Sequence, residues 1–98
     1  MNTAREYVVV KTHNFDCETE ATKFTDYCKA TAYLHWLWED YYNNEIAAGS
    51  HLDEKNCHHE GEYGKVQWDG GDYTEFHLIE ITSEYEDFPV NWERYVVE

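Results

Sequence analysis

The sequence is poor in basic residues. It contains 7 Lys and Arg against 21 Asp and Glu, which gives a formal net charge of -14 at pH 7. A chain so negative repels phosphates and anionic lipid headgroups. We therefore expect neither direct binding of DNA or RNA nor binding to a membrane, and we expect any charge-driven partner to be a basic protein.

Long hydrophobic runs are also missing. No apolar stretch approaches the ~20 residues that a membrane-spanning helix requires, and the opening residues MNTARE lack the apolar core of a secretion signal. Cysteine is scarce and odd in number, with three residues, so at least one cannot form an internal disulfide. Reduced thiols are the default without a secretion signal. These features predict a cytoplasmic protein.

The chain is too short for two hydrophobic cores. At 98 residues we expect a single domain spanning residues 1–98. Its apolar content of 42%, with 17% aromatic residues, is too high for a disordered acidic chain. The sequence therefore predicts a folded protein.

One long helix is predicted over residues 16–49. Asp16 is a suitable N-cap, no proline interrupts the stretch, and Gly49 is a suitable stop. Apolar side chains at helical spacing define a face expected to be buried: Phe24, Tyr27, Ala30, Thr31, Leu34, Leu37, Trp38, Tyr41 and Tyr42. A second stripe, on the opposite face, contains Lys29, Tyr33, Trp36 and Asp40. This stripe is either covered by the C-terminal segment or open to a partner.

Strands are predicted on both sides of the helix. Residues 5–12 (REYVVVKT) form the first strand, and residues 64–68 and 73–82 form a hairpin around the turn DGGD. Residues 50–61 are expected to be a polar loop, residues 83–88 irregular, and residues 92–97, beyond Pro89, a last strand. The predicted fold class is α+β, with one long helix packed on a small antiparallel sheet in the order strand, helix, hairpin, strand.

A loop rich in histidine is the main candidate for a metal site. The weak candidate ligands for zinc are His51, Cys57, His58 and His59, and Cys17 or His13 is a further candidate from elsewhere in the chain. Adjacent histidines rarely both reach one tetrahedral ion, and the paired spacing of zinc fingers is absent. The alternative is a polar loop that merely contains histidines, so no cofactor is part of the main interpretation.

Catalytic motifs are missing. Cys28 and His35 lie two helical turns apart, where packing is expected rather than nucleophilic chemistry. Carboxylate pairs are uninformative in so acidic a chain, and Gly70-Gly71 precedes no helix that would make a phosphate-binding loop. The sequence does not predict an enzyme.

The acids are concentrated in the second half of the chain. Residues 30–93 hold fifteen acids and only two Lys or Arg residues, and residues 66–93 hold no Lys or Arg. Strand neighbours on one face lie about 6.7 Å apart, and helical neighbours about 5–6 Å apart, so rigid carboxylates could occupy a groove that tracks phosphates. The alternative is that the acids only aid solubility. The candidate partner-binding residues are Tyr33, Trp36, Glu39, Asp40, Glu45, Asp69, Asp72, Glu75, Glu80, Glu84, Glu86 and Asp87.

In size, charge and aromatic content the chain resembles small acidic phage-encoded inhibitors of host defence, the anti-CRISPR and DNA-mimic proteins. Trp36, Trp38, Glu39, Asp40 and residues 69–93 carry this resemblance. It implies a non-enzymatic inhibitor in the host cytoplasm that binds the nucleic-acid-reading surface of a host nuclease or its guide complex. Two alternatives are a small zinc-stabilised domain and a homo-oligomeric module, such as a homodimer, that associates through Tyr33 and Trp36.

Overall fold

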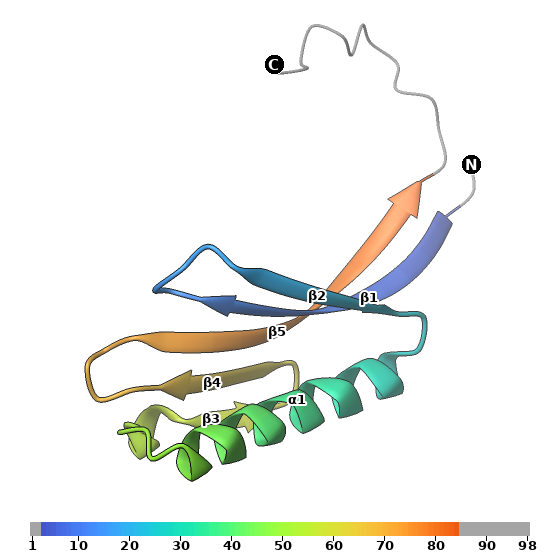
Figure 1. The fold of residues 1–98 in the computed structure, drawn as a ribbon. Coiled ribbons are helices and arrows are strands. Elements are labelled where there is room, and N and C mark those ends of the chain that lie inside the picture. Colours follow the sequence, from blue (N-terminus) through green and yellow to red (C-terminus); the bar gives the residue numbers. More distant parts are fainter. Residues whose placement is uncertain (1–2, 85–98) are drawn as a thin grey trace, which may run out of the picture.

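A computed structural model describes residues 3–84, which form one antiparallel sheet and one long helix (Figure 1). The predicted α+β fold class is confirmed. In chain order the elements are β1 (Thr3–His13), β2 (Thr19–Phe24), α1 (Tyr27–Ala47), the short 3-10 helix η1 (Glu54–Asn56), β3 (His58–Glu60), β4 (Tyr63–Gln67) and β5 (Tyr73–Glu84). The predicted last strand, over residues 92–97, lies outside the described residues.

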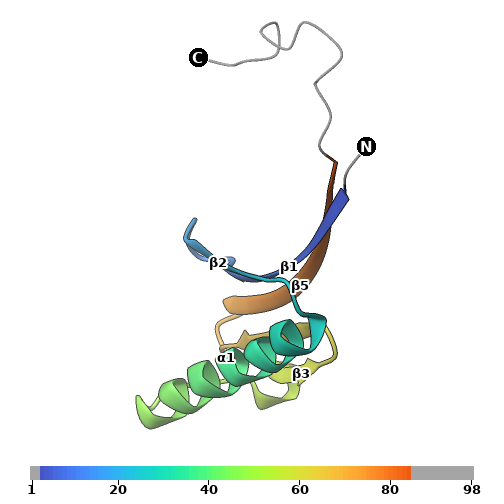
Figure 2. The same cartoon turned by 90° about the vertical axis from the view of Figure 1, so that its right-hand side faces the viewer.

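The two longest strands form the centre of the sheet. Its strand order is β2-β1-β5-β4-β3, and β1 pairs with β5 along its whole length, from Thr3 opposite Glu84 to His13 opposite Thr74. β2 pairs with β1 only over Tyr7–Thr12, and β4 pairs with β5 only over Tyr73–His77. Residues 3–6 and 81–84 therefore project from the sheet as a two-stranded arm, which rises away from the helix in Figures 1 and 2.

The helix packs on one face of this sheet (Figure 2). Helical spacing brings Ala30, Leu34 and Trp38 onto the buried side of α1, as the sequence predicts. Strand alternation brings inward-facing side chains of three strands against them. The core cluster of buried residues is Val9, Ala30, Leu34, Trp38, Val66, Phe76 and Leu78.

The helix begins at Tyr27, so the predicted start at Asp16 is wrong. Asp26 is the N-cap, and its side chain accepts a hydrogen bond from the Lys29 amide at 3.1 Å. Residues 19–24 instead form β2, because pairing with β1 satisfies backbone groups that a longer helix would satisfy internally. Phe24 consequently lies on a strand, and Tyr27 is exposed rather than buried.

The helix ends close to the predicted stop. Gly49 has a positive φ of 79°, and its amide donates to the Ile46 carbonyl. The Ser50 amide donates to the Glu45 carbonyl at 3.1 Å. These bonds satisfy carbonyl groups of the last helical turn, which is the usual reason for glycine after a helix.

The remaining local predictions divide into two groups. The first strand and the hairpin are present as β1, β4 and β5. The prediction of a polar loop over residues 50–61 is wrong, because it contains η1 and β3, and residues 83 and 84 continue β5 rather than being irregular. Over residues 3–84, no helix has the length and hydrophobicity needed to cross a membrane.

Candidate protein-binding surface

Four segments meet at the end of the molecule where α1 terminates, on the left in Figure 1: the β1–β2 turn, the β4–β5 turn, the last turn of α1 and the η1 segment. Hydrogen bonds join the two turns and the segment that precedes η1. The Asn14 amide donates to the Tyr73 carbonyl at 3.1 Å, and the Tyr73 amide donates to the Asn14 side chain at 2.8 Å. The Asp53 and Asp69 amides donate to the Gln67 and His51 carbonyls, each at 2.9 Å. These turns therefore present their side chains from a fixed backbone.

We call this region the acidic end, because seven carboxylates lie on its four segments: Asp16, Glu18, Glu45, Asp53, Glu54, Asp69 and Asp72. Five of them are exposed, and Glu45 and Asp53 are partly buried. Their charge acts on neighbouring groups. Burial raises the pKa of Tyr41, a hydrogen bond with Thr74 opposes that rise, and the charges of Glu45, Asp16 and Glu20 add to it. Two carboxylates of the acidic end, Glu45 and Asp16, thus act on the partly buried Tyr41.

Three basic residues form ion pairs away from the acidic end. Arg5 pairs with Glu80 at 3.0 Å, Lys11 with Glu20 at 3.0 Å, and Lys23 with Glu6 at 3.3 Å. Among residues 3–84, no ion pair involves any of the seven carboxylates of the acidic end. Lys55 lies next to Glu54 on η1 and is exposed, so the acidic end contains seven acids and one cation, with no ion pair between them in the described part of the chain.

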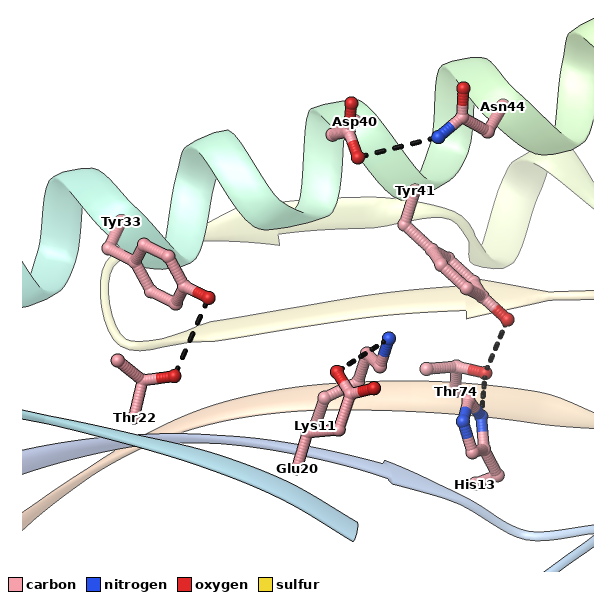
Figure 3. Close-up of polar contacts among 9 residues, drawn as sticks. All are labelled: Lys11, His13, Glu20, Thr22, Tyr33, Asp40, Tyr41, Asn44 and Thr74. Carbon is pink, nitrogen blue, oxygen red and sulfur yellow. Dashed lines mark hydrogen bonds and ion pairs between the residues drawn. The ribbon is translucent and has the colours of Figure 1, made fainter. Parts of the chain in front are cut away.

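An exposed aromatic ring lies among these acids. Phe15 in the β1–β2 turn is 47% exposed, and its ring contacts His13 at 4.8 Å and Trp68 at 5.6 Å between centroids. Beneath it, the buried Thr74 hydroxyl is hydrogen-bonded to His13 Nδ1 at 2.6 Å and to the Tyr41 hydroxyl at 3.2 Å (Figure 3). This network ties the base of the acidic end to both β5 and α1.

A second exposed aromatic lies on the outer face of α1. Trp36 is 57% exposed, with Glu39 and Asp40 exposed on the same side of the helix. Tyr33 is only half-exposed, because its ring packs on Phe24 of β2 at 5.2 Å and its hydroxyl accepts a hydrogen bond from Thr22 at 3.5 Å (Figure 3). Within the described residues, β2 is thus what covers Tyr33, while Trp36 is open.

The described structure does not bring the predicted partner-binding residues onto one surface. Three lie at the acidic end (Glu45, Asp69, Asp72) and four on or beside the outer helix face (Tyr33, Trp36, Glu39, Asp40). The others in β5 are dispersed: Glu75 accepts a hydrogen bond from the Tyr63 hydroxyl at 2.6 Å, Glu80 pairs with Arg5, and Glu84 ends the strand. Glu86 and Asp87 lie outside the described residues.

Sequence reasoning missed part of the acidic end. Phe15, Asp16 and Glu18 were assigned to a helix or to its entry, although they form a turn in which the Glu18 amide donates to the Asp16 side chain at 2.9 Å. Asp53 and Glu54 were placed in a loop of unknown position. A signal for this turn was available in the sequence. Asp16 and Glu18 are turn-type polar residues, and the threonine-rich residues 19–24 that follow them also alternate as a strand does.

The predicted metal ligands do not converge. Cys57 Sγ accepts a hydrogen bond from the Gln67 amide at 3.4 Å, His58 lies near Tyr63, His59 packs on Trp38, and His51 is exposed. Over residues 3–84, no group of three His, Cys, Asp or Glu side chains is arranged to hold a metal ion. The alternative zinc ligands His51, Cys57, His58 and His59 are therefore not brought together in this structure.

The cysteines give no sign of a nucleophile. Cys28 is exposed, not packed as its sequence position suggested. Burial raises the pKa of the Cys57 thiol, the Gln67 backbone opposes this, and the charges of Asp53 and Glu54 add to the rise. Cys57 is therefore held as the poorly nucleophilic thiol.

No protein-family model, curated protein or solved structure matches this chain.

Proposed function

We propose that the protein is a non-enzymatic inhibitor that binds the basic nucleic-acid-binding surface of another protein by presenting carboxylates in place of phosphates. The observation that carries this proposal is the acidic end: seven carboxylates and one lysine on four neighbouring segments, without ion pairs between them among the described residues, around the exposed ring of Phe15. A fixed array of this kind matches a cationic groove better than acids scattered over a surface would.

The binding free energies expected from ion pairs and from a buried aromatic ring differ, so the acids and the ring have separate roles. An exposed ion pair contributes about 0.2–1 kcal/mol, so seven such pairs fall short of the roughly 8 kcal/mol that a micromolar complex needs. A buried aromatic anchor contributes ~2 kcal/mol or more at the centre of an interface. We therefore assign steering and register to the carboxylates, and the desolvated contact to Phe15, with Trp36 as a second anchor on the adjoining helix face.

The resemblance to phage-encoded anti-defence proteins supports a particular class of partner. A nuclease of a host defence system, or a CRISPR effector with its guide RNA, has the extended cationic groove that such an array would occupy. On this proposal the protein acts in the cytoplasm of the host cell and itself binds no nucleic acid.

The test is capture from bacterial lysate on the immobilised protein, at low and at high salt, with mass spectrometry of the eluted proteins. We expect a nucleic-acid-binding protein that is retained at low salt and released at high salt, because screening weakens contacts between exposed charges. Asp69→Asn/Asp72→Asn should retain several-fold less of it than the wild type.

A matched control is available at the opposite end of β4. Glu60→Gln/Glu62→Gln removes the same number of charges from the β3–β4 turn, away from the acidic end. This variant should capture the partner as the wild type does. Equal losses in the two variants would show that only net charge matters, and capture of no nucleic-acid-binding protein at any salt concentration would refute the proposal.

A further inference from the structure

Two histidines from separate elements meet where the edge strand β3 crosses α1. His35 Nδ1 of the helix lies 2.5 Å from His59 Nδ1 of β3, and their ring centroids are 4.7 Å apart. The His59 ring also packs on Trp38 at 4.4 Å, and Trp38 stacks on Tyr42 at 4.8 Å. The contact is thus part of a layered set of rings between helix and strand.

Proton placement in this pair is restricted. An Nδ1–Nδ1 hydrogen bond needs one nitrogen with a hydrogen and one with a free lone pair. His59 Nε2 faces Glu39 Oε1 at 3.9 Å, which favours the hydrogen of neutral His59 on Nε2 and leaves its Nδ1 as the acceptor for His35 Nδ1–H. If both imidazoles were fully protonated, two N–H groups and two positive charges would point at each other, so the contact could not persist.

We propose that His35 and His59 form a proton-sensitive latch, which holds β3 against α1 at neutral pH and releases it when both rings are protonated. This inference is independent of the identity of any partner. It concerns a strand of three residues at the edge of the sheet, which pairs with β4 on one side only.

The surroundings favour the neutral form of His59. Burial lowers its pKa, and the charges of His35 and His58 lower it further, while Glu39 on the helix opposes them. On β4 the facing residue is Gly64, which contributes no charge. The unfolded chain therefore binds a proton at His59 more readily than the folded chain, so the stabilisation is complete above the ordinary pKa of about 6.5 and is lost as the pH falls below it.

Release of β3 would also loosen the segment before it. β3 follows η1 directly, and that segment carries Asp53 and Glu54 of the acidic end. Acidification would thus first release β3 from α1, and would then loosen the segment that carries Asp53 and Glu54.

The test is amide hydrogen exchange and histidine NMR of the full chain at pH 7.5 and pH 5, with exchange corrected for its intrinsic pH dependence. We expect protection of residues 58–60 and of their partners in β4 to fall several-fold at pH 5, because proton uptake by the pair favours the opened strand. The ring signals of His35 and His59 should change together between the two pH values, because the two rings are in contact.

Substitutions separate the latch from general acid sensitivity. His35→Phe keeps a ring of similar shape but removes the nitrogen, and should abolish the pH dependence of β3 protection; His59→Gln should do the same. His58→Gln, on the same strand but with its side chain on the opposite face, should retain it. Unchanged pH dependence in His35→Phe and His59→Gln would overturn the proposal, as would saturable zinc binding to the wild type at pH 7.5 that His35→Phe abolishes.

Discussion

Gly64 of β4 lies directly against side chains of α1 and β3. A Cβ atom added there would lie 2.9 Å from Cδ1 of Trp38 and 3.4 Å from Cβ of His59. The Trp38 indole N–H donates to the Lys65 carbonyl at 2.9 Å, so the ring that occupies this space is fixed to the same strand. The missing side chain of Gly64 is therefore what allows helix and sheet to pack at this distance.

Substitution of this glycine should destabilise the protein. Because the Trp38 ring is held by its hydrogen bond, Gly64→Ala should lower the free energy of unfolding by about 1–3 kcal/mol, the usual cost of overpacking. Gly70→Ala is the matched control, since nothing lies within 4 Å of its added Cβ, and it should stay within ~0.5 kcal/mol of the wild type. Urea denaturation measures both, and equal stabilities would contradict this packing.

The elements differ in how far the sequence alone could place them. The valine run of β1, the two-glycine turn between β4 and β5, and the apolar spacing of the helix interior each carry a local signal strong enough to predict the structure. β2 and β3 carry no such signal. The sequence of residues 19–24 is compatible with the start of a helix, and only pairing with β1 makes it a strand. β3 consists of His58, His59 and Glu60, which show no apolar alternation.

The same limit applies to the candidate site. Asp69 and Asp72 were identifiable from their turn, but their neighbours at the acidic end come from positions far apart in the chain. Asp16 and Glu54 approach this turn only through the antiparallel return of the strands and the direction of α1. Such a grouping depends on strand order, which the sequence could not supply.

The position of the helix start can be tested with two capping substitutions. Asp26→Ala should lower the free energy of unfolding by about 1 kcal/mol, because it removes the side chain that accepts from the Lys29 amide. Asp16→Ala should leave the helix content unchanged, since Asp16 lies in the β1–β2 turn and accepts from the Glu18 amide. Circular dichroism during urea denaturation distinguishes the two variants. A loss of helix content in Asp16→Ala but not in Asp26→Ala would contradict the start at Tyr27 and favour a helix that begins at Asp16.

At the scale of the whole molecule, net charge and exposed aromatic surface have opposite effects on self-association. A net charge of -14 opposes contact between two copies of the chain, whereas Trp36 on the helix is the kind of side chain that self-association would bury. If the proposed function is correct, Trp36 contributes to binding a basic partner, and repulsion between negatively charged copies keeps the free protein monomeric.

Light scattering tests this balance. The wild type should have the mass of a single 11.7 kDa chain, and Trp36→Ala should have the same mass. Because Trp36 is largely exposed, its substitution should also change the free energy of unfolding by less than ~0.5 kcal/mol. A wild-type dimer that Trp36→Ala converts to a monomer would favour the homo-oligomeric alternative instead.

The most direct measurement of the central claim is competition between this protein and nucleic acid for the partner it captures. Wild type, Glu60→Gln/Glu62→Gln and Asp69→Asn/Asp72→Asn would each be immobilised, loaded with that partner at low salt, and washed with increasing concentrations of duplex DNA or single-stranded RNA. If carboxylates of the acidic end occupy the phosphate-binding groove, nucleic acid should release the partner from wild type and Glu60→Gln/Glu62→Gln, and Asp69→Asn/Asp72→Asn should release it at lower concentrations. A partner that stays bound under saturating nucleic acid would show that the groove is free, and would contradict mimicry.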